Sequence, residues 1–342
     1  MKLWRSALPT IQPHYAVKAN NDSRLLKWLA AEGVKFDCAS PNEIRQALKV
    51  GAQPSDIIYA NPCKSIQDIQ AAVQLGIPTT VVDSPEEVQK LLEAGFGAEG
   101  RPANTLIRLK VSDSGSAQPF SRKFGMPIAW IPEVLELMRG TGLHHVGWSF
   151  HVGSLCNQPQ QFAAAVELCA EADAIARAPA RIIDVGGGFH SDPEQFGAAA
   201  AELRRAQRWF PEAHWIAEPG RFFAAPIVTL RVPVIGVKAR SDRSGWIYTV
   251  AESVYGSFSN IPFDGQVPTY RLLASDAASR PKARATIFGR TCDSADCLAE
   301  DIELPELRVG DLLEVPNMGA YTTVSATTFN GFPKTKRLYG RV

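Results

Sequence analysis

The sequence lacks an excess of charge of either sign. Its 342 residues include 36 Lys and Arg against 35 Asp and Glu, which gives a net charge of +1. This balance does not support nucleic acid or a membrane surface as a partner, because both attract strongly basic proteins. No apolar run reaches the length of a membrane span, and segment 1–15 has no apolar core typical of a signal peptide. The sequence therefore predicts a cytoplasmic protein.

Cysteine is also sparse and scattered. The cysteines lie at positions 38, 63, 156, 169, 292 and 297. They have neither the paired spacing of a zinc site nor the density of a disulfide-linked fold. We therefore expect free thiols and no bound metal.

What the sequence does contain is a repeated unit of a short apolar strand followed by a helix. Helix starts are marked by capping boxes with proline at the first helical position, at 40–43 and 84–87, and helix ends by Gly33, Gly51 and Gly95. Strands are expected at 14–20, 34–38, 57–60, 79–83, 105–111, 145–150, 181–185 and 215–217. Eight such units in about 225 residues predict an α/β fold of the (β/α)8 TIM-barrel type, with a doubly wound open sheet as the alternative.

The pattern changes after Phe222. Alternating β-branched and aromatic segments lie between Gly, Pro, Asp and Ser turns, with little helical periodicity. Strands are expected within 226–237, 246–250, 285–288, 312–315 and 321–326. We therefore predict a barrel domain over 1–225 and an all-β domain over 226–342.

Unusual residues follow the barrel strands where a TIM barrel places its active site, at the C-terminal strand ends. They are Lys18, Asp37, His151, the triple glycine Gly186–Gly188 and Glu218. Lys18 is expected within an alternating aromatic strand, among Tyr15 and its neighbours. Desolvation there would disfavour the charged amine and make it a better nucleophile toward carbonyls. The alternative is a lysine that extends from the strand rim into water.

Each of the other residues has two interpretations. Gly186–Gly188 can cradle a phosphate or form a plain tight turn. Glu218 suits a protonated ring nitrogen and Arg221 a phosphate, or the two form a local ion pair. His151 can stack on a flat ring or be a core histidine. A reactive lysine, a carboxylate for a ring nitrogen, an imidazole that stacks on a ring and a phosphate cradle together describe a pyridoxal 5'-phosphate site.

Motifs that cover nearly the whole chain extend this interpretation. In order they are YAVKAN, FDCASPNE, IIYANPCK, SFHVGS, DVGGGF, EPGR, VYGSF, TCDSAD, NMGAYT and TFNGF. With them the chain resembles the eukaryotic-type ornithine decarboxylases, pyridoxal-phosphate enzymes built from an alanine-racemase-like barrel and a β domain. The resemblance implies that Lys18 binds the cofactor covalently, His151 stacks on its ring and Glu218 binds its pyridine nitrogen. The other implied cofactor residues are Asp37, Ser154, Gly186, Gly187, Gly188, Gly220, Arg221 and Tyr321, several of them at the phosphate.

The resemblance also implies a substrate site. Cys292 would return a proton to Cα after CO2 leaves, Asp264 and Asp293 would bind the distal ammonium of the substrate, and Tyr255 and Phe329 would complete the site. In this family the segments that hold Cys292, Asp293 and Phe329 reach across a head-to-tail dimer interface. A homodimer with shared active sites is therefore expected.

The function implied is decarboxylation of a basic amino acid, with L-ornithine to putrescine and CO2, in polyamine biosynthesis, as the favoured reaction. Lysine or another diamino acid is the alternative substrate, and a non-catalytic regulatory paralogue similar to antizyme inhibitors is the alternative of another class. The sequence departs from the family near the substrate pocket, at Phe263 and Gly265 beside Asp264, at Pro119 where an arginine is usual, and at Arg290 where a proline is usual. The family also has an N-terminal segment that adds a strand to the β domain, so here that domain is expected to close differently or the chain to be a natural short form.

Overall fold

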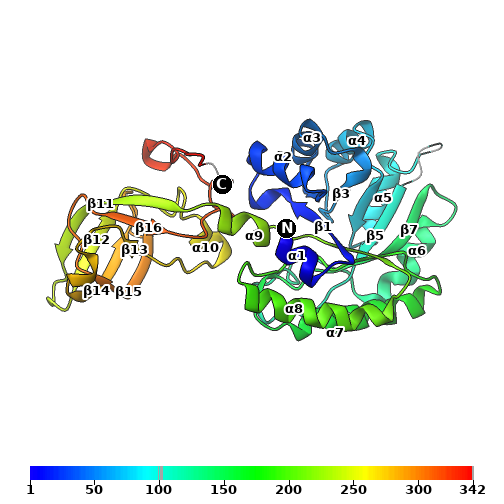
Figure 1. Ribbon diagram of the computed structural model, residues 1–342. Helices are drawn as coiled ribbons and strands as arrows, with labels where there is room; N and C mark the ends of the chain where they lie inside the picture. The colour runs from blue at the N-terminus through cyan, green and yellow to red at the C-terminus, as the bar shows by residue number, and fades with distance from the viewer. Residues whose placement is uncertain (99, 101–102, 341–342) are drawn as a thin grey trace. The chain divides into compact units, whose positions relative to one another are not determined.

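The structure is a computed structural model that describes residues 1–98, 100 and 103–340. The chain divides into two compact units, Met1–Phe223 and Ala224–Val342. This division falls slightly before the domain boundary expected after residue 225. We call them the barrel unit and the β unit and describe each by itself (Figure 1).

The barrel unit is a closed ring of eight parallel strands in the order β1-β10-β9-β7-β5-β4-β3-β2. Because β1 pairs with both β10 and β2, the ring has no free edge, and this excludes the open sheet. The barrel prediction is confirmed. The strands are β1 (Ile11–Ala16), β2 (Lys35–Cys38), β3 (Ile57–Tyr59), β4 (Thr79–Val82), β5 (Ala103–Arg108), β7 (Leu143–Ser149), β9 (Ile182–Asp184) and β10 (His214–Ala217).

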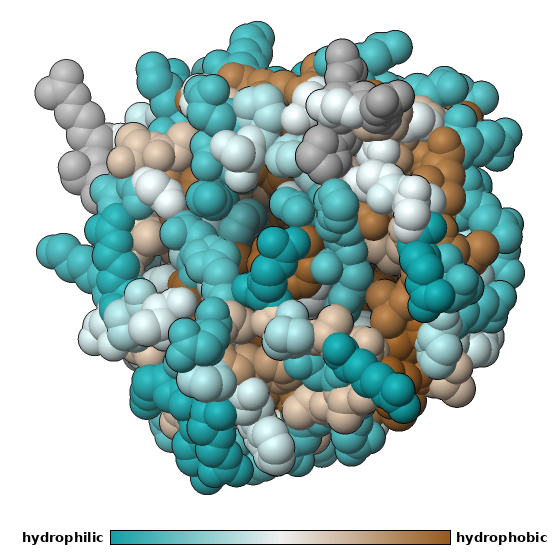
Figure 2. Space-filling view, turned by 90° about the vertical axis from the view of Figure 1, so that its right-hand side faces the viewer, coloured by the Kyte–Doolittle hydropathy of each residue, from teal (hydrophilic) through white to brown (hydrophobic). Residues whose placement is uncertain are grey.

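Helices surround these strands on the outside (Figure 1). They are α1 (Lys2–Ala7), α2 (Ser23–Ala31), α3 (Pro41–Lys49), α4 (Ile66–Gln74), α5 (Pro85–Glu93), α6 (Ile131–Met138), α7 (Gln160–Ala176) and α8 (Pro193–Ala206). The four-residue α9 (Arg221–Ala224) follows β10, and the division between the two units falls within it. The predicted caps are present: the Ser40 hydroxyl accepts a hydrogen bond from Glu43 N at 3.3 Å, and Ser84 does the same for Glu87 N at 3.2 Å. On the face shown in Figure 2, hydrophilic residues project and hydrophobic residues lie between them. In the part of the chain that the structure describes, the helices are too short or too polar to cross a bilayer.

The first helix, α1, was not predicted from the sequence. Its Trp4 is buried, and its ring lies 5.2 Å from the ring of Phe189 and 5.3 Å from that of Phe222. A six-residue helix is too short for periodicity to reveal, and its stability depends on contacts with other parts of the chain, which include the hydrogen bond from Arg5 to Glu32 O at 2.7 Å. Short 3-10 turns complete the connections: η1 (Val17–Ala19), η2 (Pro54–Asp56), η3 (Ile128–Trp130), η4 (Gln207–Trp209), η5 (Ala225–Ile227), η6 (Ala277–Ser279) and η7 (Phe329–Gly331).

The interior of the barrel is packed with aliphatic side chains. Ile58, Val81, Leu106, Val146 and Ile216 come from five different strands and form one buried cluster. This packing makes the strands a rigid mount for the groups that follow them at the rim.

The long polar loop at 112–121 is partly ordered as a strand. β6 (Ser116–Gln118) pairs antiparallel with β8 (Ser154–Cys156), which follows β7. Neither three-residue strand was predicted, because each depends on a partner about 40 residues away in the chain. The pair joins the loop after β5 to the loop after β7.

The β unit is a six-stranded sheet in the order β13-β16-β11-β12-β14-β15. Its elements are β11 (Leu230–Ala239), β12 (Trp246–Val250), α10 (Asn260–Asp264), β13 (Arg271–Leu272), β14 (Lys282–Phe288), β15 (Cys297–Pro305) and β16 (Leu312–Val315). The prediction of a strand within 321–326 is wrong. The backbone turns there, and Tyr321 has a left-handed φ of 55°, which a strand cannot contain. β13, β15 and α10 were missed.

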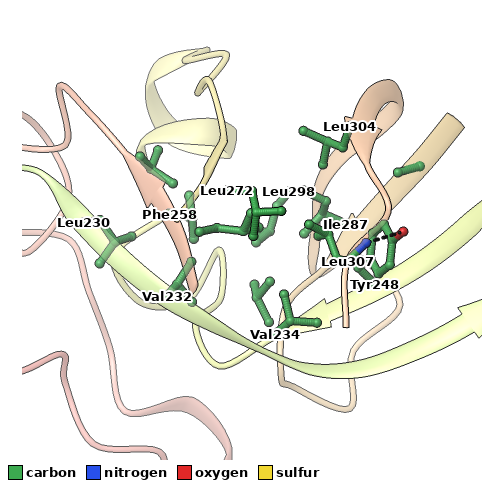
Figure 3. Packing of buried hydrophobic residues seen from close by; sticks show 14 of the residues in the cluster. Leu230, Val232, Val234, Tyr248, Phe258, Leu272, Ile287, Leu298, Leu304 and Leu307 are labelled. Atoms are coloured by element: carbon green, nitrogen blue, oxygen red, sulfur yellow. Dashed lines mark hydrogen bonds between the residues drawn. The ribbon is translucent and has the colours of Figure 1, made fainter. Parts of the chain in front are cut away.

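Alternate residues of β11 form the core of this unit. Leu230, Val232 and Val234 project from one face of the strand toward Phe258 and Leu272 (Figure 3). The buried Tyr248 hydroxyl accepts a hydrogen bond from Leu307 N at 3.1 Å, so this core also contains a satisfied polar group. Strong alternation explains why β11 could be predicted from the sequence.

Candidate active site

Lys18 lies on a turn just beyond the first barrel strand. The expectation that it lies within the strand is wrong, because β1 ends at Ala16 and Lys18 is the middle residue of η1. The Tyr15 hydroxyl donates to Asn20 O at 2.9 Å and ties the turn back to the strand. The Lys18 side chain is 43% exposed, so in this chain by itself the alternative holds, in which the lysine extends into water and is not desolvated. The turn instead presents the amine at the strand end.

Asp37, near the end of β2, faces this amine. Its Oδ2 lies 3.9 Å from Lys18 Nζ, and the Asp37 side chain is 2% exposed. Within the described residues no hydrogen bond reaches that oxygen. Burial raises the pKa of Asp37, while the charges of Lys18 and Arg108 act in the opposite direction. The lysine therefore stands against a buried carboxylate.

Two more buried carboxylates lie at the ends of β9 and β10. Asp184 accepts hydrogen bonds from Ser149 Oγ and Gly186 N, both at 3.0 Å, and burial raises its pKa to about 6. Burial also raises the pKa of Glu218 well above its ordinary value, and the charges of Asp184 and Asp37 add to this effect. Glu218 Oε1 accepts no hydrogen bond from the described residues. A protonated ring nitrogen is the kind of cationic donor that this oxygen needs.

Arg108 is a site residue that the sequence reasoning missed. It ends β5, its side chain is buried, and its guanidinium lies 4.9 Å from the centre of the Phe124 ring. Burial lowers the pKa of Arg108, and the nearby charges of Glu218, Asp83, Asp184 and Asp37 counteract that shift. The sequence shows only an isolated arginine at the end of the fifth strand, which by itself matches no motif. Arg108 places a fixed positive charge among the buried carboxylates.

His151 follows β7 and is buried as a neutral ring. Burial lowers its pKa well below the ordinary value, and the charges of Arg108 and Lys18 add to the shift. Its Nδ1 accepts a hydrogen bond from Gly153 N at 3.0 Å, which places the ring proton on Nε2. The Phe120 ring lies 4.7 Å away at 54°. A neutral, fixed imidazole of this kind suits stacking on a flat ring.

The loop that contains Phe120 is held by one carboxylate. Asp113 is buried and accepts hydrogen bonds from Phe120 N, from Ser121 N at 2.6 Å and from Ser121 Oγ at 2.6 Å. The long loop after β5 is therefore fixed beside His151.

The triple glycine packs closely against the His151 segment. A Cβ on Gly186 would lie 2.2 Å from Phe150 O, one on Gly187 would lie 2.8 Å from His151 Nε2, and one on Gly188 would lie 2.6 Å from Gly153 O. Gly186 and Gly188 also have positive φ angles of 62° and 96°. Only glycine fits these conditions. The glycines are thus required by close packing and by backbone conformation, and they leave a surface where backbone can approach a ligand.

Ser154 and Arg221 meet at the same end of the barrel. Arg221 Nη2 donates to Ser154 Oγ at 3.1 Å, and both side chains are buried. Arg221 begins α9, directly after Gly220. A guanidinium and a hydroxyl that share one position can together contact an anion such as a phosphate. With the unsatisfied Glu218 oxygen and the glycine loop, these residues fit pyridoxal 5'-phosphate.

A second group of predicted residues gathers on loops of the β unit. The Tyr255 hydroxyl donates to Asp293 Oδ2, and the Tyr255 ring stacks on Phe329 with centroids 4.3 Å apart at 29°. Hydrogen bonds from Tyr255 and from Ala295 N lower the pKa of Asp293. Tyr255, Asp293 and Phe329, which we call the substrate cluster, therefore present an ionised carboxylate beside aromatic rings.

The remaining predicted residues also belong to the β unit. Cys292 is exposed, and its backbone N donates to Asn330 Oδ1 at 3.2 Å, next to Phe329. Asp264 is buried at the end of α10, on a different element from the substrate cluster. Tyr321 lies on the turn after β16 with its left-handed backbone. The assignment of these residues to substrate or phosphate stays a prediction.

Residues 1–225 match the family model described as "Pyridoxal-dependent decarboxylase, pyridoxal binding domain". The chain belongs to the pyridoxal-dependent decarboxylases. An ornithine decarboxylase of Caenorhabditis elegans is 38% identical over 361 residues, which cover 99% of this chain and 83% of that protein. The resemblance to ornithine decarboxylases, the pyridoxal-phosphate cofactor and the decarboxylase class are confirmed.

Solved structures of this decarboxylase family share the fold. The arginine decarboxylase of Paramecium bursaria Chlorella virus superposes with a TM-score of 0.90 at 34% identity, covering 97% of this chain and 90% of that chain. The lysine/ornithine decarboxylase of Vibrio vulnificus, in complex with putrescine, gives a TM-score of 0.84 at 32% identity, covering 97% of this chain and 88% of that chain. An antizyme inhibitor 2 of Xenopus laevis is 35% identical over 347 residues, covering 95% of this chain and 75% of that protein. The two solved decarboxylases are named for different substrates, although their sequence identities to this chain are similar.

Proposed function

We propose that this decarboxylase converts L-ornithine to putrescine and CO2, as a step of polyamine biosynthesis in the cytoplasm. The observation that supports it best is the carboxylate of Asp293, kept ionised by Tyr255 beside the Phe329 ring. An ionised carboxylate near apolar rings suits the distal ammonium of a diamino acid together with its methylene chain. Similarity to ornithine decarboxylases over nearly the whole chain supports the choice of ornithine.

The residues of the barrel unit would hold the cofactor in defined ways. Lys18 would hold it through the amine, Glu218 would keep a proton on the ring nitrogen, His151 would stack on the ring, and Arg221 with Ser154 would bind the phosphate. When bound, the cofactor supplies an acceptor for the electron pair that the Cα–carboxylate bond releases. Asp37 and Arg108 set the charge around the Lys18 amine.

The β unit would supply the remaining groups. After CO2 has left, the Cys292 thiol would give a proton to Cα and become a thiolate. Asp293, with Asp264 as the second expected carboxylate, would hold the distal ammonium and so fix which end of the substrate reacts.

We further propose a homodimer in which the β unit of one chain completes the site of the other. Cys292, Asp293 and Phe329 would reach the partner subunit's cofactor. Tyr255 contacts both Asp293 and Phe329 within one chain, so it would enter the partner's site with them. A lone subunit should then be inactive.

The substrate test is CO2 release from L-ornithine, L-lysine, L-arginine and diaminopimelate by purified protein with added cofactor. Release from ornithine at the highest kcat/KM supports the proposal. Other substrates must be tested because one methylene changes specificity by only about 10- to 200-fold. Release mainly from one of them would agree with decarboxylase chemistry and overturn the choice of ornithine.

Matched variants distinguish the enzyme from a regulatory paralogue. Cys292→Ala should lower CO2 release, while Cys63→Ala, which changes another exposed thiol, should not. A wild-type protein that binds cofactor, as visible absorbance shows, but releases no CO2 from any of the four substrates would contradict the ornithine proposal. A protein that does not bind the cofactor would favour the regulatory alternative.

A further inference from the structure

The loop that carries Cys292 and Asp293 is in contact with the C-terminal segment of the chain. This loop, residues 289–296, joins β14 to β15. Cys292 N donates to Asn330 Oδ1 at 3.2 Å, and Arg290 Nη2 donates to Pro333 O at 3.0 Å. The Arg290 guanidinium also stacks on the Phe332 ring, 4.4 Å from its centre. Segment 330–335, which we call the C-terminal strap, therefore touches the loop at both of these residues.

Beneath this contact lies a buried carboxylate that the proposed reaction does not use. The Glu252 side chain is 3% exposed, and Oε1 accepts a hydrogen bond from Ser253 N at 3.0 Å. Oε2 accepts a hydrogen bond from Thr335 Oγ1 in the strap. Arg290 Nη2 lies 4.0 Å from Oε1, and Arg290 N donates to Glu252 O at 3.1 Å. Loop and strap are thus both attached to Glu252.

Arg290 joins all the parts of this arrangement. Its guanidinium supplies positive charge near a buried carboxylate, which is costly to leave unpaired. The same planar group donates to a strap carbonyl and stacks on a strap ring, and a lysine ammonium cannot do both. The backbone of Arg290 contributes as well. Its backbone N–H bond to Glu252 O is one that proline could not make.

We propose that Arg290 is a positioning residue that fastens the C-terminal strap to the loop, and thereby fixes the orientation of Cys292 and Asp293 for proton transfer and substrate binding. The role of those two residues rests on the proposed function. The fastening itself concerns the local order of the loop and can be measured without turnover.

The experiment compares Arg290→Met with Arg290→Lys and with Arg284→Met. Arg284, on β14, pairs with Asp301 at 2.8 Å and is 56% exposed, so it is a matched arginine away from the strap. All variants carry Cys63→Ala, so that Cys292 is the one fully exposed thiol among the described residues. The rate of Cys292 modification by a thiol reagent, and kcat and KM for L-ornithine, are measured on cofactor-loaded protein.

We expect Arg290→Met to raise the modification rate of Cys292 several-fold and to lower kcat by about 10- to 100-fold with a higher KM, because misplaced reactive groups lose proximity. Visible cofactor absorbance and circular dichroism should stay unchanged. Arg290→Lys should give intermediate values, and Arg284→Met should behave as the parent.

A second variant covers the case in which Arg290→Met fails to fold. Thr335→Val removes the other attachment to Glu252 without changing charge and should also raise the Cys292 modification rate. Unchanged modification rates in both Thr335→Val and a folded Arg290→Met would overturn the positioning role, even if the wild type decarboxylates ornithine. If the Cys292 modification rates are raised in the variants but the wild type does not act on ornithine, the positioning role of Arg290 stands and the proposed substrate is wrong.

Discussion

The two groups of functional residues differ in how their chemistry is set. In the barrel unit, Asp37, Asp184, Glu218 and His151 are all buried, and burial is the largest cause of each pKa shift. In the β unit, Asp293 is partly exposed, and its pKa is lowered by hydrogen bonds, which outweigh the opposite effect of burial. The difference indicates that the cofactor end is fixed by a rigid, desolvated frame. The proposed substrate site is held by loop contacts, which a few substitutions can change.

Three of the four departures from the family pattern agree with this contrast. Phe263, Gly265 and Arg290 lie in the β unit, close in sequence to Asp264 or Cys292, whereas Pro119 lies in the barrel unit. The lysine, histidine, glutamate and arginine expected at the cofactor are all present in the barrel unit. Substrate choice is therefore the property that we expect to differ first between this chain and its relatives.

The largest effect is expected from Lys18→Ala. Removing the amine that holds the cofactor should lower kcat/KM by about 10³-fold or more and abolish the visible absorbance of the loaded enzyme. Lys27→Ala, which changes an exposed lysine on α2, is the control. Comparable activity in Lys18→Ala and the control would remove Lys18 from the mechanism.

The next effect concerns the frame around the ring nitrogen. Glu218→Gln keeps the shape of the side chain but removes the charge that would hold a proton on the ring. We expect kcat to fall by about 10²- to 10³-fold, while the protein still binds cofactor. The measurement is kcat with saturating cofactor, beside an absorbance titration for its affinity. A variant with wild-type kcat would show that the buried carboxylate does not act on the ring.

A smaller effect is expected at the substrate cluster. Tyr255→Phe removes the hydrogen bond that lowers the pKa of Asp293, so that pKa should rise toward its ordinary value. Asp293 can bind an ammonium only when it is ionised. As the pH is lowered, KM should therefore begin to rise at a higher pH in Tyr255→Phe than in the wild type. The loss in kcat/KM near neutral pH should be about tenfold. Because an ordinary aspartate titrates at about pH 4, measurement of kcat/KM from about pH 3.5 to 8 tests this, and an acid limb that moves to lower pH or stays in place would contradict it.

The smallest effect is a pH dependence of barrel stability. Burial lowers the pKa of His14, on β1, to about 3, and the charge of Lys35 adds to the shift. The unfolded chain binds a proton near pH 6.5 and the folded chain does not, so stability falls as the pH falls below about 6.5. Between pH 6.5 and 5 the loss from this one group is about 2 kcal/mol.

His14→Gln should therefore flatten the dependence of the thermal midpoint on pH in this range, and His144→Gln, at an exposed position, should leave it as in the wild type. Differential scanning calorimetry at pH 5 and 7.5 measures the difference. Parallel curves for wild type and His14→Gln would show that His14 is not the group responsible.

The sequence predicted the parts of this fold that depend on local patterns. Caps such as Ser40 and Ser84 depend on residues three positions away, and the alternation in β11 is visible within ten residues. It did not predict α1, β6 or β15. The first two are short and depend on partners far away in the chain. In β15, charged residues at 300, 301 and 303 interrupt the apolar pattern.

The candidate site shows the same limit. The positions of Lys18, His151 and Glu218 at strand ends follow from the repeat of strand and helix. The exposure of Lys18 does not, because it depends on whether Tyr15 and Asn20 close a turn after the strand. Arg108 was missed because an isolated arginine has no motif. Its role is visible only when β5, β9 and β10 bring it near the carboxylates.

The most direct test of the account mixes two inactive variants, Lys18→Ala and Cys292→Ala, under conditions that exchange subunits. If each site combines the barrel unit of one chain with the β unit of its partner, half of the sites in a mixed dimer are intact. Random mixing should then restore about a quarter of the wild-type CO2 release from L-ornithine. Mixed samples that exchange subunits but stay as inactive as either variant alone would contradict the shared site.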